Sequence, residues 1–332
     1  MGRLINPESN SSTKVDAMNV YEKIKDVWSQ YQEDFEERLR EWADNLRGKR
    51  EEVRRNRVQF RAWKPLEVYV SHSLVKQGGF SIRFLGQEVA QLKILKGKKT
   101  LIIKEKHRHK KDHFDSKGFK PGKFSWEEAR QFRRHFKKLS DSEEELKPGI
   151  GEHKLEWLFL REMSKQSRKK FAGKLSLIQP VKIARCFLQM PLPIKGSSGN
   201  PQRGDGHIDI LARRRRKDGK VVLSLWELKD VGKLANAVRQ AYIYALTLLM
   251  MLRSPSGQKW YNIFGFKGKI PEKLDVEAVV AVSKSQKDKL LKAVEQAKNE
   301  MPLDVKEGKV KLYACYYEPP PEKGIPEQSR PN

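Results

Sequence analysis

Residues 206–229 read GHIDILARRRRKDGKVVLSLWELK, two apolar segments on either side of a strongly charged turn. Each apolar segment is predicted to be a strand, and together they predict a hairpin. Asp209 interrupts the first strand, whereas Glu227 and Lys229 end the second. Residues two apart on a strand point to the same face, so Glu227 and Lys229 stand side by side. Burying these groups is costly unless they pair or hold a metal, and taken alone they favour a plain ion pair.

The turn of this hairpin decides which face Asp209 occupies. A two-residue turn at 218–219 would pair Asp209 with Leu228 and direct it away from Glu227. A three-residue loop over 217–219, ending in a left-handed glycine with a bulge, would place Asp209 opposite Glu227. We predict the three-residue loop. Two carboxylates and one ammonium would then converge on one point and hold Mg²⁺, with Mn²⁺ as a substitute, because hard cations prefer oxygen ligands.

Helices and strands alternate on both sides of the hairpin, between residues 151 and 318. Helices are predicted over Glu152–Lys165, Leu234–Leu252 and Gln286–Glu300, and strands near Ala184–Pro191, His207–Arg213, Val221–Lys229, Val276–Ser283 and Val310–Tyr317. Such alternation predicts an α/β fold, with a sheet covered by helices on its faces. We assign residues 149–318 to this C-terminal domain.

The N-terminal residues 1–63 are predicted to be helical. From Asp16 to about Arg47 apolar residues recur every three or four positions, which indicates an amphipathic helix. Gly48 is expected to end it, and the basic stretch 49–61 to continue as a second helix. The apolar stripe is rich in aromatic residues and needs a cover, either the rest of this chain or a partner protein.

Residues 64–148 are predicted to form a small basic β module with one helix. Apolar residues alternate after Pro65, which indicates an antiparallel sheet. The capping-box pattern Ser125-x-x-Glu128 opens the helix. Its outer face carries Arg130, Arg133 and Arg134. These arginines suit a nucleic-acid backbone or an ordinary solvated face.

Two further segments mark the ends of the C-terminal domain. The stretch 140–151 is acidic and then bears Pro and Gly, so we place a domain boundary there. The tail 319–332 has almost nothing to bury and is predicted to be disordered.

The composition indicates a polyanionic partner. The chain has 332 residues with 69 Lys and Arg against 42 Asp and Glu, a formal charge of +27. Nucleic acid is the usual partner of so cationic a surface, and an anionic membrane is the rival. The longest apolar run, 241–252, is too short to span a bilayer, so we expect a cytoplasmic, DNA-associated protein. Cys186 and Cys315 are expected to be buried thiols rather than parts of a disulfide framework or zinc site.

An ordered set of motifs gives the chain a resemblance to a known superfamily. The set comprises Gly206, then Asp209 three residues later, then Glu227-x-Lys229, then Gln240-x-x-x-Tyr244 on the next helix. It resembles the PD-(D/E)XK nuclease superfamily, of restriction-endonuclease-like fold, and within it the RecB-like branch with a QxxxY element. The resemblance covers about 170 residues. The sequence departs from the pattern at Ile208, where the proline of the superfamily name would stand, and two acids, Glu152 and Glu156, fit the first helix equally.

The resemblance implies a mixed sheet and Mg²⁺-dependent hydrolysis of DNA phosphodiester bonds. Asp209, Glu227 and the Leu228 carbonyl would ligate the metal, and Glu156 would bind it directly or through water. Lys229 would orient the water and stabilise charge on the phosphorane. Gln240 and Tyr244 would contact the scissile strand. Further nucleic-acid contacts are predicted for Arg213, Arg214, Arg215, Arg216, Lys233, Arg239, Arg130, Arg133 and Arg134; the run 213–216 is alternatively a plain charged turn or a localisation signal.

Three functions stay open, a DNase and two alternatives to it. The chain is either an active DNase, a nuclease-fold protein that binds DNA or assembles without cleaving it, or a nuclease directed to RNA. Sequence does not choose between ends and internal sites, single and double strands, or defence, repair and mobile-element roles. A homodimer is a further possibility, because a blunt double-strand cut usually requires two active sites.

Overall fold

The computed structural model describes residues 12–61, 64–70, 79–95, 98–104, 119–141, 152–164, 178–183, 186–229 and 234–317. The predicted disordered tail 319–332 and the predicted contact residue Lys233 lie outside these residues.

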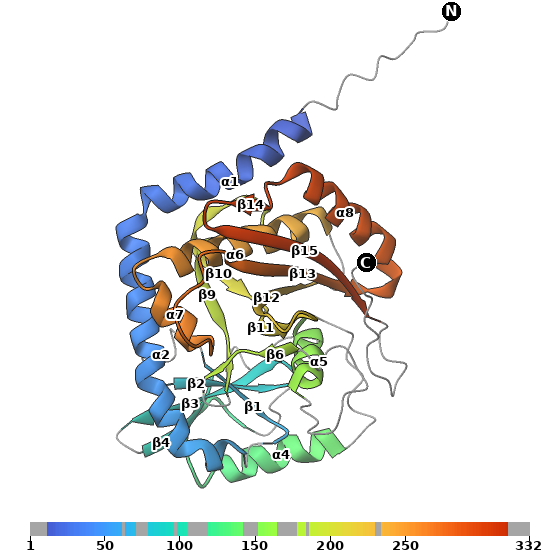
Figure 1. Cartoon of the computed structure of the whole chain (residues 1–332). Coiled ribbons are helices and arrows are strands. Elements are labelled where there is room, and N and C mark those ends of the chain that lie inside the picture. Colours follow the sequence, from blue (N-terminus) through green and yellow to red (C-terminus); the bar gives the residue numbers. More distant parts are fainter. Residues whose placement is uncertain are drawn as a thin grey trace, which may run out of the picture.

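A six-stranded mixed sheet forms the centre of the C-terminal half (Figure 1). In spatial order its strands are β14 (Asp304–Val305), β15 (Gly308–Tyr317), β13 (Asp275–Ser283), β12 (Val221–Leu228), β11 (Ile210–Arg215) and β6 (Ile178–Pro180). The strands β12, β13 and β15 run parallel, whereas β14, β11 and β6 pair antiparallel with their neighbours. The predicted α/β class is confirmed.

The hairpin of β11 and β12 has the predicted register. Ile210 pairs with Trp226, which places Asp209 opposite Glu227. The three-residue loop over 217–219 ends in a glycine with φ of +79°, in the left-handed region. The two-residue turn, which would direct Asp209 to the other face, is not adopted.

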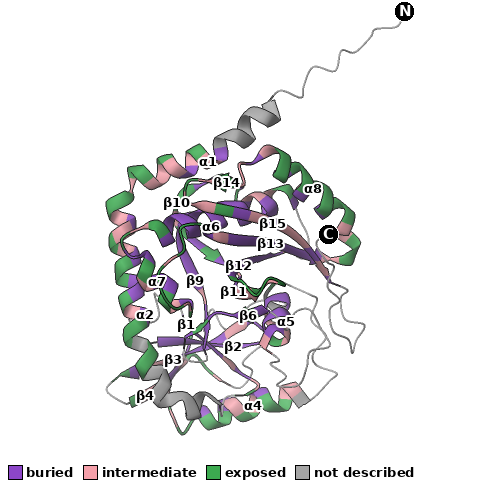
Figure 2. Cartoon of the chain, viewed as in Figure 1, coloured by how far each residue is buried: buried purple, intermediate pink, exposed green. Residues whose placement is uncertain are grey.

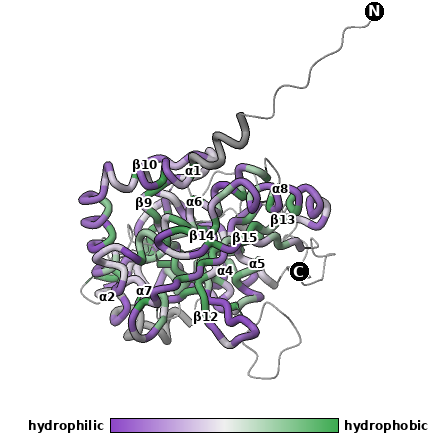
Figure 3. The backbone as a smooth tube through the Cα atoms, turned by 45° about the horizontal axis from the view of Figure 1, so that its top comes forward, coloured by the Kyte–Doolittle hydropathy of each residue, from purple (hydrophilic) through white to green (hydrophobic). Residues whose placement is uncertain are grey.

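Helices cover both faces of this sheet. They are α5 (Glu152–Ser164) on one face, and α6 (Leu234–Arg253) and α8 (Lys287–Glu300) on the other, with the short α7 (Gly257–Ile263) after α6. Each face has its own apolar core: Trp226 and Leu228 of β12 pack with α5, whereas Leu223 and Leu225 pack with α6. Helix α6 is buried around most of its circumference, purple in Figure 2, whereas the outer helix α8 is largely hydrophilic (Figure 3).

A second sheet of seven strands lies beside the first. In spatial order it contains β5 (Gly122–Ser125), β4 (Lys98–Ile103), β3 (Gln87–Leu95), β2 (Gly79–Phe84), β1 (Glu67–Val70), β8 (Cys186–Leu188) and β7 (Lys182–Ile183). Strands β1 to β5 pair antiparallel, as the alternation predicted. Strand β8 pairs parallel with β1, Tyr69 lying opposite Phe187. This sheet therefore joins strands from both sides of the predicted boundary between 148 and 149.

Two smaller elements lead into the site. Strands β9 (Met190–Lys195) and β10 (Gln202–Ile208) form an antiparallel ribbon that ends one residue before Asp209. Helix α4 (Ala129–Asp141) packs on the second sheet through Phe132 and Phe136. Its predicted capping box is present, since the Glu128 backbone N–H donates to Ser125 Oγ and the Ser125 N–H donates to the Glu128 carboxylate.

The N-terminal segment forms a long arm along one side of the molecule (Figure 1). It consists of α1 (Ser12–Gln30) and α2 (Gln32–Arg61), with a break at Tyr31. The prediction that Gly48 ends the helix is wrong, because α2 continues through it. A glycine within a helix costs only about 1 kcal/mol, which the tertiary contacts of α2 offset.

The aromatic stripe of this arm is covered by the chain itself. Phe35 and Leu39 are fully buried, and Trp42 is 4% exposed. Trp260 of α7 donates its indole N–H to the Leu39 carbonyl at 3.1 Å. Of the two covers weighed from the sequence, the chain's own C-terminal half is the one found here.

No helix among the described residues is long and apolar enough to cross a membrane. Cys186 and Cys315 are buried and form no disulfide, as expected, and burial raises the pKa of each thiol to about 12.

Candidate active site

Asp209 lies at a bend between β10 and β11, where the ribbon enters the central sheet. Its Oδ2 accepts a hydrogen bond from the Leu228 backbone N–H at 2.8 Å. This bond ties Asp209 to the end of β12, next to Glu227. The structure therefore brings Asp209, Leu228 and Glu227 together, as predicted.

Glu227 and Lys229 lie at the C-terminal end of β12. The Lys229 ammonium lies 3.0 Å from Glu227 Oε1 and 3.2 Å from Glu152 Oε1. The Glu227 side chain is 2% exposed, and its Oε2 has no hydrogen-bond partner among the described residues. A buried carboxylate oxygen of this kind is available to a further ligand.

Glu156, one turn further along α5, has a partner that the sequence did not reveal. Arg83 of β2 donates from Nη1 to both Glu156 oxygens, at 3.2 and 3.1 Å. Both side chains are nearly buried, at 7% and 11% exposed. No local sequence signal indicated this pair, because its members are 73 residues apart, one in strand β2 and the other in helix α5.

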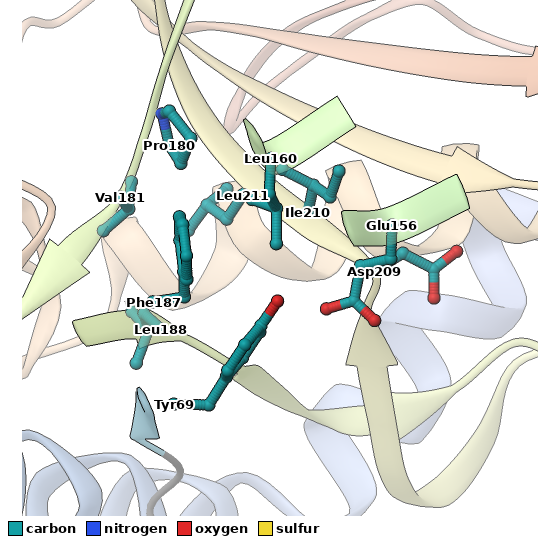
Figure 4. Close-up of a pocket in the computed structure, with 10 residues that line it drawn as sticks. All are labelled: Tyr69, Glu156, Leu160, Pro180, Val181, Phe187, Leu188, Asp209, Ile210 and Leu211. Atoms are coloured by element: carbon teal, nitrogen blue, oxygen red, sulfur yellow. The ribbon is translucent and has the colours of Figure 1, made fainter. Parts of the chain in front are cut away.

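The Glu156 and Asp209 carboxylates lie close together at one end of a recess (Figure 4). Apolar side chains of Leu160, Phe187 and Ile210 form part of its wall, together with Tyr69. The two acids that fitted the first helix thus take different places: Glu152 contacts Lys229, and Glu156 lies beside Asp209.

Burial and mutual repulsion shift the acids of this group. Desolvation raises the pKa of Asp209 from its ordinary 3.8 to about 7, against the hydrogen bond from Leu228. Desolvation, and next the Asp209 carboxylate, raise the pKa of Glu227 well above its ordinary value. Burial lowers the pKa of Lys229, but Glu227 and Glu152 raise it by more, so the ammonium is charged at neutral pH. Clusters of perturbed groups of both signs are typical of functional sites.

Helix α6, which carries Gln240 and Tyr244, packs against β9 and β12. Gln240 Nε2 lies 3.4 Å from the Tyr244 hydroxyl. Desolvation and the charge of Glu227 raise the pKa of Tyr244. Gly206 leaves room for this ring, because a Cβ there would lie 2.9 Å from Tyr244 Cε1 and 2.3 Å from the Ile194 carbonyl oxygen. The motif residues Gly206, Gln240 and Tyr244 are therefore brought together, and the charge of Glu227 acts on Tyr244.

The arginine run lies elsewhere. Residues 213–216 run along the second half of β11 into the hairpin loop, so at ~3.3 Å per residue they lie roughly 13 to 23 Å along the strand from Asp209. Arg214 and Arg216 pair with the fully buried carboxylate of Glu277, at 2.7 and 3.0 Å, and Arg216 pairs with Asp275 at 2.6 Å. Arg213 donates to the Gly265 carbonyl and to Gln179, and Arg215 is exposed. The structure does not place this run beside the carboxylates.

The other predicted contact residues are dispersed. Arg130 and Arg134 are exposed on α4, and Arg133 lies over the Trp126 ring. Arg239 is half-buried on α6, and its Cδ would lie 3.7 Å from a Cβ at Gly199. None of these arginines lines the recess that Glu156 and Asp209 share.

The donor set of the site consists of carboxylate oxygens. Within the described ranges, no three His, Cys, Asp or Glu side chains are gathered closely enough to form a metal centre as they stand. Several of these oxygens contact Lys229, Arg83 or the Leu228 N–H, whereas Glu227 Oε2 has no hydrogen-bond partner among the described residues. Comparison of the chain with protein-family models, curated proteins and solved structures finds no match.

Proposed function

We propose that the chain is a metal-dependent nuclease that hydrolyses DNA phosphodiester bonds. The observation that carries the proposal is the hairpin register, which sets Asp209 opposite Glu227 with Lys229 3.0 Å from the Glu227 carboxylate. The opposite register would have left a charged hairpin with no hydrolytic centre.

The strand order supports a restriction-endonuclease-like arrangement. An antiparallel hairpin, β11–β12, is followed by the parallel strands β13 and β15, with α5 on one face and α6 on the other. Asp209 lies at the bend where β10 and β11 meet, Glu227 lies near the end of β12, and the Gln-Tyr helix packs on the α6 face of the sheet. These features agree with the order of motifs in the sequence.

The proposed reaction requires a divalent cation, and the acids present would have to draw closer together to hold one. Asp209, Glu227 and either Glu152 or Glu156 would hold Mg²⁺ through oxygen, with Mn²⁺ as a substitute, and Glu227 Oε2 is the oxygen that is buried without a partner among the described residues. The Leu228 carbonyl is a further donor proposed from the sequence. When bound, the cation lowers the pKa of a coordinated water and offsets the charge of the phosphate.

The side chains around these acids have complementary roles. Lys229, charged and 24% exposed, would hold the attacking water and stabilise the charge that builds on the phosphate oxygens. Gln240 and Tyr244 would hold the scissile strand by hydrogen bonds, and packing of Tyr244, at 2% exposed, keeps their helix against the site.

A basic face supports nucleic acid as the partner. Exposed cations lie on or beside β4, β5 and α4; they are Lys98, Lys104, Lys120, Lys123, Arg130, Arg134, Lys137 and Lys138. We define these residues as the basic face. Lysine and arginine on one such face bind phosphates by releasing condensed counterions.

The test is cleavage of plasmid, linear and single-stranded DNA in Mg²⁺ or Mn²⁺, with and without chelator. We expect Asp209→Ala and Lys229→Ala to abolish cleavage, because each removes a group that acts on the water or the phosphate, while gel-shift affinity stays within a few fold. Unchanged cleavage by either variant would refute the assignment.

The same experiment separates the alternatives. A wild-type chain that binds DNA but never cleaves it would be an inactive nuclease-fold protein. Preferential competition by single-stranded RNA over single-stranded DNA would identify an RNA-directed enzyme instead.

A further inference from the structure

Arg83 enters the candidate active site from the N-terminal sheet. Along β2, Phe80, Ile82 and Phe84 point into the apolar core, so Ser81 and Arg83 point to the opposite face. The pairing of β2 with β3 shifts by one residue between Ile82 and Arg83. Such bulges redirect side chains, and they are common beside active sites.

Arg83 is held on two sides. Its guanidinium carbon lies 4.2 Å from the centre of the Tyr69 ring, a cation–π contact within β1 and β2. On the other side its Nη1 contacts both oxygens of Glu156. Tyr69 and Glu156 both line the recess that contains Asp209 (Figure 4). Arg83 therefore connects the N-terminal sheet to the helix that carries two of the acids.

The charges of the site explain why the contact of Arg83 with Glu156 is needed. Asp209, Glu227, Glu152 and Glu156 are four acids whose charges act on one another. Lys229 offsets Glu227 and Glu152 by direct contact, but Glu156 lies nearer Asp209 and needs a separate cation. Arg83 supplies it, since a buried carboxylate without a counter-charge would be displaced or protonated.

We propose that Arg83 is a positioning residue of the active site: it fixes Glu156 beside Asp209, so that the site is completed by the N-terminal half of the chain. The proposal rests on the proposed nuclease function. It also assigns different roles to the two helix acids, since Glu156 is held by Arg83 whereas Glu152 faces Lys229. Partners of this kind orient the groups that touch a metal or substrate, and their loss usually weakens function about 10–100-fold.

The test uses Arg83→Gln, Glu156→Gln and the double variant in the full chain. Cleavage kinetics, Mn²⁺ binding by calorimetry and thermal unfolding are measured on each. We expect Arg83→Gln to lower kcat about 10–100-fold with KM for DNA within threefold, and to weaken Mn²⁺ binding about tenfold. Arg83→Lys, which keeps the charge, should recover part of both losses.

The double variant separates positioning from simple charge balance. Because it removes the buried charge together with its partner, it should recover thermal stability, yet cleavage and Mn²⁺ affinity should stay low. Recovery of cleavage to within threefold of wild type would show that Arg83 only balances a charge, and would overturn the proposal. Arg38→Gln is the matched control, since it breaks a contact between the N-terminal arm and Asp205 outside the carboxylate group and should leave kcat unchanged.

Failure of the parent proposal gives a different result. A wild-type chain that binds Mn²⁺ without cleaving DNA would refute the nuclease function, and the calorimetric comparison of the variants would still decide the role of Arg83. A wild-type chain that binds no Mn²⁺ would overturn both proposals.

Discussion

At the residue scale, Asp209 shows what it costs this protein to hold a partly buried acid away from water. Among the described residues it accepts one hydrogen bond, from the Leu228 N–H, which does not offset desolvation, so its pKa in the folded chain is about 7. An acid whose folded-state pKa lies above its unfolded value binds more protons when folded. Its contribution to stability is therefore present at low pH and is lost as pH rises between about 4 and 7.

Asp209→Asn should make this loss visible. Asparagine can accept the same hydrogen bond but does not ionise, so the gain in Tm over wild type should grow from pH 4 to 7 and then level off. The measurement is thermal unfolding in chelator across this range. Asp205→Asn, at an exposed position four residues earlier, serves as the control. A gain at Asp209 that is the same at pH 4 and pH 8 would contradict the raised pKa.

Turn chemistry made Asp209 predictable, whereas its surroundings were not. The glycine of the 217–219 loop fixed the register, and the register placed Asp209 opposite Glu227. The role of Arg83 was not predicted, because the alternation of residues along a strand indicates which face a side chain occupies but not which residue lies opposite it. The arginine run was misplaced for a simpler reason. A strand rises ~3.3 Å per residue, so the tip of a hairpin that begins at Asp209 lies far from Asp209.

At the scale of elements, periodicity predicted the helices α5, α6 and α8 and the strands β12, β13 and β15 to within a few residues. The strands expected over Ala184–Pro191 and His207–Arg213 are each divided in two, the first between β8 and β9 and the second between β10 and β11. The helix expected over Leu234–Leu252 is α6, and the strand expected over Val276–Ser283 is β13. Short or non-local pairings were missed, among them β8 with β1, because two or three residues carry no period. Gly48 was misread since glycine is a common helix end, but tertiary packing overrides propensity.

Gly48→Ala should stabilise the chain by about 0.5–1 kcal/mol. Position 48 is helical in the folded protein, and alanine there lowers the conformational entropy of the unfolded chain. A Cβ at Gly48 would meet nothing within 4 Å. Urea unfolding measures the effect as a higher midpoint.

Gly219→Ala is the opposed control, since a Cβ there also meets open space but φ is +79°, a conformation that alanine rarely adopts. This variant should be destabilised. If both variants shift the midpoint in the same direction, backbone conformation is not what distinguishes the two glycines.

At the scale of the whole molecule, the two halves are joined at several places. The arm binds the C-terminal half through Trp260 and Leu39, and through the ion pair of Lys259 with Asp44 at 2.9 Å. Strand β8 continues the N-terminal sheet, and Arg83 reaches α5. The boundary drawn from composition at 140–151 thus marks a change in sequence character, while packing continues across it.

The net charge of +27 also acts at the scale of the whole molecule, and we expect the basic face to be the part of the surface that binds nucleic acid. Arg134 and Lys137 are exposed on α4. If both contact phosphates, Arg134→Gln/Lys137→Gln should reduce the slope of log K against log salt by up to about 2, because each phosphate contact contributes ~0.9. Lys289→Gln/Lys292→Gln on α8 removes the same charge from another surface and should leave the slope unchanged. Fluorescence anisotropy with duplex DNA at several salt concentrations measures both, and equal slopes for the two double variants would mean that the charge acts as a whole and not through the basic face.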